Sequence, residues 1–362
     1  MIGRRVRSLL RPLLALLLAA GFAAGFVVVG AAPAGAHGLT GAQPSNYASR
    51  VLSVSPRVAG LTVRIRDLGA RVEVRNDTAS EVTVLGYSGE PYLRIGPAGV
   101  FENTRSPAVF LDRATTVTQA VPRSYDATAT PVWKRVDGAH VARWHDHRVH
   151  WMGSSEPPAV SSSPGRTHLI SDWMITLRYR GEPVVVRGDL RWVPGPSALP
   201  RLGLALVVAI AIVALGLTRR WGDVAAIALV ATAALVLVLV AGEWSSTSGG
   251  AWVAFLSTVY SILGAAIALA AAGSMLRSRH TPDAATPIVL VAAVVLAFGS
   301  GLADITALDR SQLPTTLSPA LDRTFVALVL GASVGLLVTA ARRLRGTPRA
   351  PVPATATPPA TV

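Results

Sequence analysis

The sequence predicts an exported all-β sandwich followed by an α-helical bundle of five transmembrane helices. Three observations predict it: a signal-like N-terminus, a stretch in which apolar and polar residues alternate, and five long apolar runs in the second half. Of the 362 residues, 51% are hydrophobic and 15% are charged, a balance that favours membrane spans. Cysteine is absent, which excludes disulfides, thiolate metal sites and cysteine nucleophiles.

Residues 1–36 have the pattern of a signal peptide. Basic residues precede an apolar run at 13–29, and Ala34-Gly35-Ala36 supplies the small residues of a cleavage site. Cleavage at this point makes His37 the N-terminus of the mature chain. The alternative is an uncleaved anchor helix, because an apolar run of about 17 residues is also long enough to span a bilayer.

Residues 37–196 are predicted to form the extracytoplasmic β-sandwich. Residues 61–66 and 70–75 alternate apolar with polar side chains, and Asp67-Leu68-Gly69 lies between them as a turn. Residues 81–87 repeat the alternation. Period-two alternation broken by turns is typical of antiparallel strands that have one buried and one wet face.

Later in this domain, two turn signals predict two more hairpins. Asp137-Gly138 separates residues 132–136 from residues 141–151, and Gly181-Glu182-Pro183 separates residues 172–179 from residues 184–193. The Ser/Pro-rich stretch 154–165 is predicted to be a loop. We therefore expect an Ig-like sandwich of about seven to nine strands with no long helix.

Residues 197–345 are predicted to be the membrane domain, in which every apolar run is long enough to cross a hydrocarbon core. The runs are 199–217, 224–241, 251–272, 287–303 and 325–341. Arginines follow the first, third and fifth runs, at 219–220, 277–279 and 342–345. The positive-inside rule then predicts a multi-pass protein of the cell membrane, with its N-terminal domain outside and its C-terminus in the cytoplasm. Residues 346–362, rich in Pro, Ala and Thr, are predicted to be a disordered cytoplasmic tail.

The predicted spans contain few side chains that carry chemistry. They have no central charged residue of the kind that marks an ion or proton pathway. Glu243 and Asp304 lie at outer ends, where we interpret them as interfacial residues. Gly264, Gly331 and Gly335 are expected to let helices pack closely.

The segment from Arg143 to Met152 is the strongest functional signal. It contains His145, His147 and His150, which are three of the seven histidines of the chain, between two tryptophans. On a strand, His145 and His147 project from one face, whereas His150 needs a bend to join them. Neutral imidazoles suit copper, zinc or nickel, and a chain without cysteine must build such a site from nitrogen and oxygen ligands. The alternative is a polar segment whose histidines only hydrogen-bond and pack.

His37 adds weight to the metal interpretation, because a mature N-terminal histidine offers its α-amine and its imidazole to one ion. With His37 after Ala34-Gly35-Ala36 and a later His145-Asp146-His147 segment, the exported part resembles the CopC-like periplasmic copper-binding proteins. That resemblance implies a small β-sandwich and a copper site. The chain departs from the family pattern, since His-x-His stands where the family has Asp-x-His, the β-domain is longer and its strands do not align with those of the family.

Three further segments resemble a group of uncharacterised actinobacterial membrane proteins. These segments are Tyr-Leu-Arg-Ile-Gly-Pro at 92–97, Trp-His-Asp-His-Arg-x-His-Trp-Met at 144–152 and Ser-Gln-Leu-Pro at 311–314. The likeness spans the mature chain, and the group brings no established activity with it.

The function predicted from these residues is a membrane-anchored binding protein of the cell envelope that holds copper at His37, His145, His147 and His150. The alternative is a structural or interaction module without metal, whose Trp/His segment docks an envelope protein partner or braces the sheet against the membrane. A copper oxygenase is a third class, although no residue pattern marks a substrate face. The formal charge of +14 includes no basic run with interleaved aromatics, which argues against a nucleic-acid partner.

Overall fold

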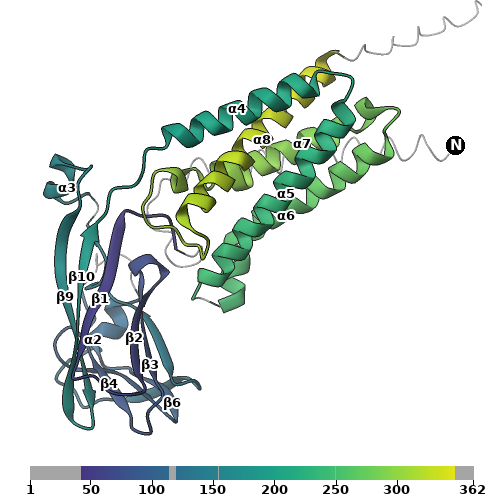
Figure 1. Ribbon diagram of the computed structural model, residues 1–362. Coiled ribbons are helices and arrows are strands. Elements are labelled where there is room, and N and C mark those ends of the chain that lie inside the picture. The colour runs from purple at the N-terminus through teal and green to yellow at the C-terminus, as the bar shows by residue number, and fades with distance from the viewer. Residues whose placement is uncertain (1–41, 114–119, 154, 249, 347–362) are drawn as a thin grey trace, which may run out of the picture.

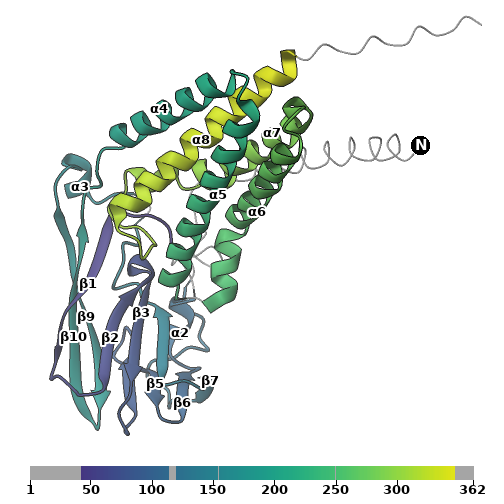
Figure 2. The same cartoon turned by 45° about the vertical axis from the view of Figure 1, so that its right-hand side comes forward.

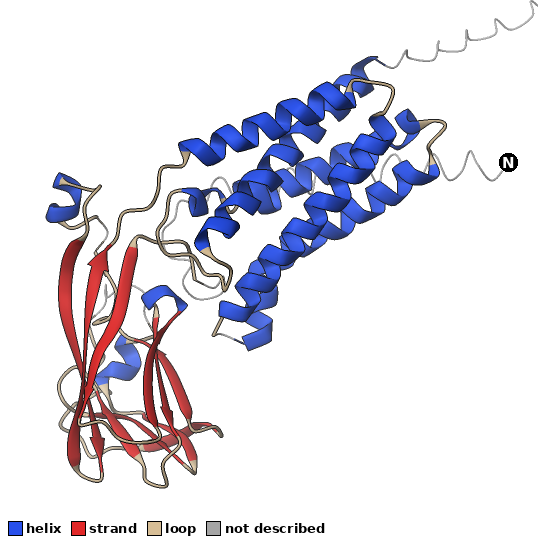
Figure 3. Ribbon diagram, in the orientation of Figure 1, coloured by secondary structure: helices blue, strands red, loops and turns tan. Residues whose placement is uncertain are grey.

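The computed structural model describes residues 42–113, 120–153, 155–248 and 250–346. These residues form a β-domain and a bundle of long helices, and two views show the β-domain at one end of the bundle (Figures 1 and 2). Strands and long helices are confined to separate parts of the molecule (Figure 3). The predicted signal peptide, His37 and the tail at 347–362 lie outside the described residues.

The β-domain consists of two antiparallel sheets that enclose one apolar core. The larger sheet has the order β1-β10-β9-β4-β5-β6-β7 and the smaller one β2-β3-β8. Val72 and Val74 of the small sheet pack in the core with Ile95, Ile175 and Leu177 of the large sheet. The strands are β1 (Tyr47–Ser55), β2 (Leu61–Arg66), β3 (Arg71–Asn76), β4 (Val82–Leu85), β5 (Pro91–Gly96), β6 (Gly99–Asn103), β7 (Trp133–Asp137), β8 (Val141–His145), β9 (His168–Tyr179) and β10 (Glu182–Trp192).

The predicted hairpin around Asp137-Gly138 is wrong. Strand β7 pairs with β6 in the large sheet, whereas β8 pairs with β3 in the small sheet, so this connection crosses between the sheets. The Asp137 side chain accepts a hydrogen bond of 2.7 Å from the Ala139 amide, a local turn that needs no pairing of the flanking strands. By contrast, the predicted hairpin around Asp67-Leu68-Gly69 is confirmed as β2–β3.

Three other expectations need correction. The last turn of the domain is Arg180-Gly181, and Pro183 already lies in β10. The pairing of β10 with β1 does not reach Pro183, so the amide hydrogen that proline lacks is not needed for a hydrogen bond between these strands. The predicted loop at 154–165 contains the short helix α3 (Pro158–Ser162), and α2 (Pro107–Leu111) is a second short helix. The described residues hold ten strands, more than expected, because β1 and the β5–β6 hairpin have little alternation.

Five helices are long and apolar enough to cross a membrane, as the sequence predicts. The fourth is not regular throughout, because α7 continues into a wider turn, η3 (Ala297–Leu302), at the Gly299-Ser300-Gly301 segment. The elements of the bundle are α4 (Leu199–Gly216), α5 (Trp221–Ser246), α6 (Gly250–Arg277), η2 (Pro282–Ala285), α7 (Thr286–Leu296), η3, η4 (Ile305–Leu308) and α8 (Pro319–Gly346).

Glycines bring α4 and α8 into close contact. A Cβ atom on Gly331 would lie 2.4 Å from the Ala205 carbonyl oxygen, and one on Gly335 would lie 2.9 Å from the Ala209 carbonyl oxygen. The predicted packing role of these two residues is confirmed. Gly264 differs, because the nearest atom to its added Cβ lies at an ordinary 3.4 Å.

Two loops of the bundle hold the β-domain. The backbones of Ser45 and Gln312 exchange hydrogen bonds of 3.0 and 2.8 Å, and the Asn46 side chain accepts one of 2.8 Å from the Ser311 amide. Separately, the Asp67 carboxylate at the tip of the β2–β3 hairpin accepts hydrogen bonds from Ser248, in the loop between α5 and α6. The 311–314 segment singled out in the sequence is therefore part of the contact between the two domains.

Candidate functional site

The histidine segment begins as a strand and ends in a turn, because Asp146 points into the core. Strand β8 ends at His145, and Asp146 is fully buried. Its carboxylate accepts hydrogen bonds from Trp144 Nε1 at 2.9 Å and from Arg148 Nε and Nη2 at 2.8 and 2.7 Å. Burial alone would raise the pKa of Asp146, but the hydrogen bonds and charge of Arg148 outweigh it and hold this pKa below its usual range.

The turn after Asp146 supplies the bend that His150 requires. Two backbone amides bond back to Asp146, that of Arg148 to the side chain at 3.0 Å and that of Val149 to the carbonyl at 3.2 Å. Val149 is buried in the β-domain core and fixes the turn against it. His150 is thereby returned toward the strand that it has just left.

All three predicted histidines lie together. The ring centres of His145 and His150 are 4.6 Å apart, those of His145 and His147 are 5.1 Å apart, and those of His147 and His150 are 6.4 Å apart. Two imidazoles that bind one metal ion at about 2.0 Å from each ligating nitrogen have ring centres roughly 4.5–6.4 Å apart. The spacing of the rings thus matches a shared ion.

His145 is held in a defined orientation. Its Nδ1 lies 2.7 Å from the carbonyl oxygen of Ala70, so Nδ1 carries the proton and Nε2 carries the lone pair. Metal-binding histidines are commonly oriented by such a bond to a backbone carbonyl. In the conformation described, no three His, Asp or Glu side chains of residues 42–346 are arranged to hold a metal ion.

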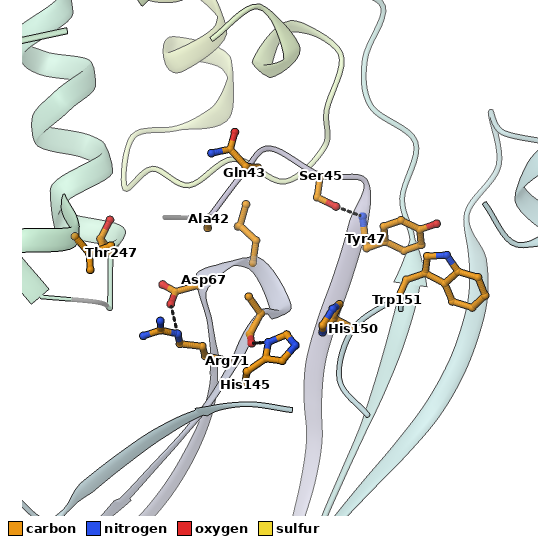
Figure 4. A pocket seen from close by; sticks show the side chains of 13 residues that line it. Ala42, Gln43, Ser45, Tyr47, Asp67, Arg71, His145, His150, Trp151 and Thr247 are labelled. Carbon is orange, nitrogen blue, oxygen red and sulfur yellow. Dashed lines mark hydrogen bonds and ion pairs between the residues drawn. The ribbon is translucent and has the colours of Figure 1, made fainter. Parts of the chain in front are cut away.

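The cluster borders a cavity between the β-domain and the helices. The cavity has a volume of about 160 Å³, and His145 and His150 line it together with Tyr47, Asp67 and Trp151. Figure 4 shows His145 and His150 on the β-domain side and Thr247 of the helical part on the other side. Ala42, the first described residue, also lines the cavity.

A buried network of polar side chains holds the backbone of His147 in place. The hydroxyl of Tyr87 accepts a hydrogen bond of 3.0 Å from the His147 amide and donates one to Asp112. The Arg148 guanidinium lies 4.7 Å from the centre of the Tyr87 ring. Burial, and then the negative charge of Asp146, raise the pKa of Asp112 to about 8. The pKa values of the two carboxylates in this network are therefore shifted in opposite directions.

A comparison with family models, curated proteins and solved structures found no match. The resemblances to CopC-like proteins and to the actinobacterial group therefore remain predictions from the sequence. The copper ligand set likewise stays a prediction. His37, its fourth member, precedes the described residues by five positions.

One group of side chains was not recognised from the sequence. Glu243, Asp304 and Asp322 line a second cavity, of about 230 Å³, at the same end of the bundle. Burial, and then the charges of Glu243 and Asp322, raise the pKa of Asp304 to about 8. Each carboxylate follows or precedes a different apolar run, and sequence spacing alone did not indicate that these ends meet.

Proposed function

We propose that this chain is a membrane-anchored protein of the cell envelope that binds one copper(II) ion at His145, His147 and His150, with His37 as a further ligand. The proximity of the three imidazole rings carries the proposal: their centres are 4.6–6.4 Å apart, and two of them, His145 and His150, line a cavity. The donors are all nitrogen atoms, which suit copper(II) better than hard cations that prefer oxygen. Binding therefore requires the rings to reorient toward one ion, because the described side chains are not arranged to hold a metal ion.

The position of Ala42 makes the contribution of His37 feasible. His37 lies five positions before Ala42, and an extended chain spans about 3.3–3.6 Å per residue, a reach of roughly 17 Å. Since Ala42 already lines the cavity, this reach covers the histidine cluster. The proposal requires cleavage after Ala36, so N-terminal sequencing should return His37-Gly38-Leu39; a chain that begins at Met1 removes the α-amine from the ligand set.

We further propose that the β-domain is outside the cell and that the C-terminus is in the cytoplasm. Arginines gather at the end of the bundle opposite to the β-domain: Arg343 donates to the carbonyl oxygen of Thr218 at 2.6 Å and pairs with Asp283 at 3.1 Å. Basic residues concentrate on the cytoplasmic side of membrane proteins. The copper site then faces the outer surface of the membrane.

A copper titration of the purified full-length protein tests the binding function. Affinity is measured by competition with a chelator, for the wild type, His147→Ala and the control His168→Ala, whose ring lies beside Ser163 instead of in the cluster. Loss of one ligand from so small a set should weaken binding at least tenfold, about 1.4 kcal/mol, whereas the control should bind normally. Affinity should also fall as pH drops through the range in which imidazole takes up a proton.

The interaction module remains the second candidate, and the position of the segment favours it. Trp151 stacks near Tyr47 with ring centres 6.4 Å apart, where β1 meets the loops of the bundle. In this function the histidines brace the two domains or a partner. His145→Ala and His147→Ala should then lower the melting temperature, while added copper changes nothing.

A further inference from the structure

The turn at the tip of the β2–β3 hairpin has an unusual backbone. Its residues Asp67, Leu68 and Gly69, which form η1 (Asp67–Gly69), have φ angles of 50°, 55° and 101°. The left-handed region brings the Cβ atom of an L-residue close to the following carbonyl oxygen, and leucine gains nothing there in return. Such a conformation persists only when its surroundings hold it in place.

Contacts on both sides of the domain boundary hold this turn, in addition to a local ion pair of 3.6 Å between Asp67 and Arg71. On the helical side, the Asp67 carboxylate accepts hydrogen bonds from the amide of Ser248, at 3.1 Å, and from its hydroxyl. On the β-domain side, the Ala70 carbonyl accepts the 2.7 Å bond from His145 Nδ1. Only two residues, Leu68 and Gly69, separate Asp67 from Ala70, so a shift of either contact displaces the other.

We propose that this turn couples the histidine site to the loop between α5 and α6, with Asp67 as the positioning residue. Ordering of the His145 ring fixes the Ala70 carbonyl, which stabilises the strained turn and the Asp67–Ser248 contact. Coupling between two sites is reciprocal: docking of the loop must raise the affinity of the histidines for a ligand by the same factor by which the bound ligand raises the docking equilibrium constant. The effect of a ligand on the loop rests on the proposed copper function. The coupling between His145 and the loop through the turn does not rest on it.

The other contact between the domains provides an internal control. The chain just before β1 is tied to the 311–314 segment by the Ser45–Gln312 backbone pair and by Asn46, and these hydrogen bonds do not involve residues of the turn. A general loosening of the β-domain should affect both contacts. Coupling through the turn should affect the α5–α6 loop alone.

Hydrogen exchange of the full-length protein in lipid nanodiscs, without metal, tests the coupling. The variants are His145→Ala and Asp67→Asn. Because asparagine tolerates a left-handed φ, Asp67→Asn weakens the contact with Ser248 while the turn keeps its backbone conformation. The matched controls are His140→Ala and Asp77→Asn, which alter a 2.9 Å ion pair at the other end of strand β3. Amides at 245–248 should exchange at least threefold faster in both test variants and in neither control, with no change at 311–314.

The double variant and copper complete the experiment. His145→Ala combined with Asp67→Asn should exchange no faster than the faster single variant, because both act through one turn. Copper should slow exchange at 245–248 in the wild type and not in Asp67→Asn. Unchanged exchange at 245–248 in a folded His145→Ala variant overturns the coupling. An absence of copper binding overturns the proposed function alone, because the comparison of variants needs no metal.

Discussion

At the scale of single residues, Asp146 determines the shape of the histidine segment. Its carboxylate is buried between His145, which lines the cavity, and His147, and Arg148 folds back to pair with it. A lowered folded-state pKa means that this pair contributes stability above the ordinary range of aspartate titration and loses it as pH falls below that range. The pair is therefore intact at neutral pH.

Asp146→Asn should destabilise the β-domain and disrupt the arrangement of His145, His147 and His150. Breaking a buried ion pair leaves the Arg148 charge uncompensated, at a cost of about 3–5 kcal/mol in the free energy of unfolding. Thermal unfolding and copper titration, on the same samples, measure both effects. Asp189→Asn is the matched control, since Asp189 is a buried aspartate paired with Arg50 and Arg191 away from the cluster. It should lower stability and leave copper affinity unchanged; equal losses of affinity would contradict the positioning role of Asp146.

At the scale of elements, the β9–β10 hairpin has a residue that fits its turn poorly. Arg180 and Gly181 both have positive φ angles, 52° and 88°, a combination that favours Asn-Gly. Arg180→Asn should therefore raise the free energy of unfolding by about 0.5–1 kcal/mol, measured by thermal denaturation. The substitution removes a hydrogen bond from Arg180 to Ser80 and the stacking of the guanidinium over the Tyr179 ring. A drop in stability would show that these two interactions outweigh backbone strain.

The contact between α4 and α8 gives a second prediction at this scale. Gly331→Ala places a methyl group against the Ala205 carbonyl and should cost about 1–3 kcal/mol. Gly264→Ala finds ordinary space and should be neutral or slightly stabilising, because alanine favours helix over glycine. Unfolding in mixed detergent micelles measures both variants. Equal effects would mean that close packing of α4 on α8 does not limit stability.

Periodicity predicted those elements whose environment matched their local sequence. The five apolar runs and the β2–β3 hairpin were predicted because burial against lipid or one core leaves a regular pattern. The pairing of β7 and β8 was not, because Asp137-Gly138 specifies a local turn and says nothing about which sheet each strand joins. The histidine cluster was predicted in part: His-x-His spacing indicated two rings, whereas the return of His150 depends on burial of Asp146 and Val149.

At the scale of the whole molecule, the two domains meet over a set of cavities that share the start of the described chain. Ala42 lines the cavity beside the histidines, a larger one of about 360 Å³ and the one with three carboxylates. No alternation or motif in the sequence indicates this convergence, because it depends on how the β-domain docks on the bundle.

The proposed orientation of the molecule rests on the arginines at the far end of the bundle. A reporter fused after Val362 should be active in the cytoplasm, and one inserted at Ser246 should be active outside. Paired phosphatase and fluorescent reporters measure the two positions. An external C-terminus would contradict the five-span arrangement or the proposed side of the β-domain.

The most direct test of the copper site is paramagnetic resonance of the mature full-length protein, titrated with copper(II). The proposed function predicts one copper per chain with nitrogen-dominated hyperfine structure, lost when His145 and His147 are replaced together by alanine and retained in His168→Ala. A stoichiometry near zero for the wild type, or a signal that the double replacement leaves unchanged, would contradict it.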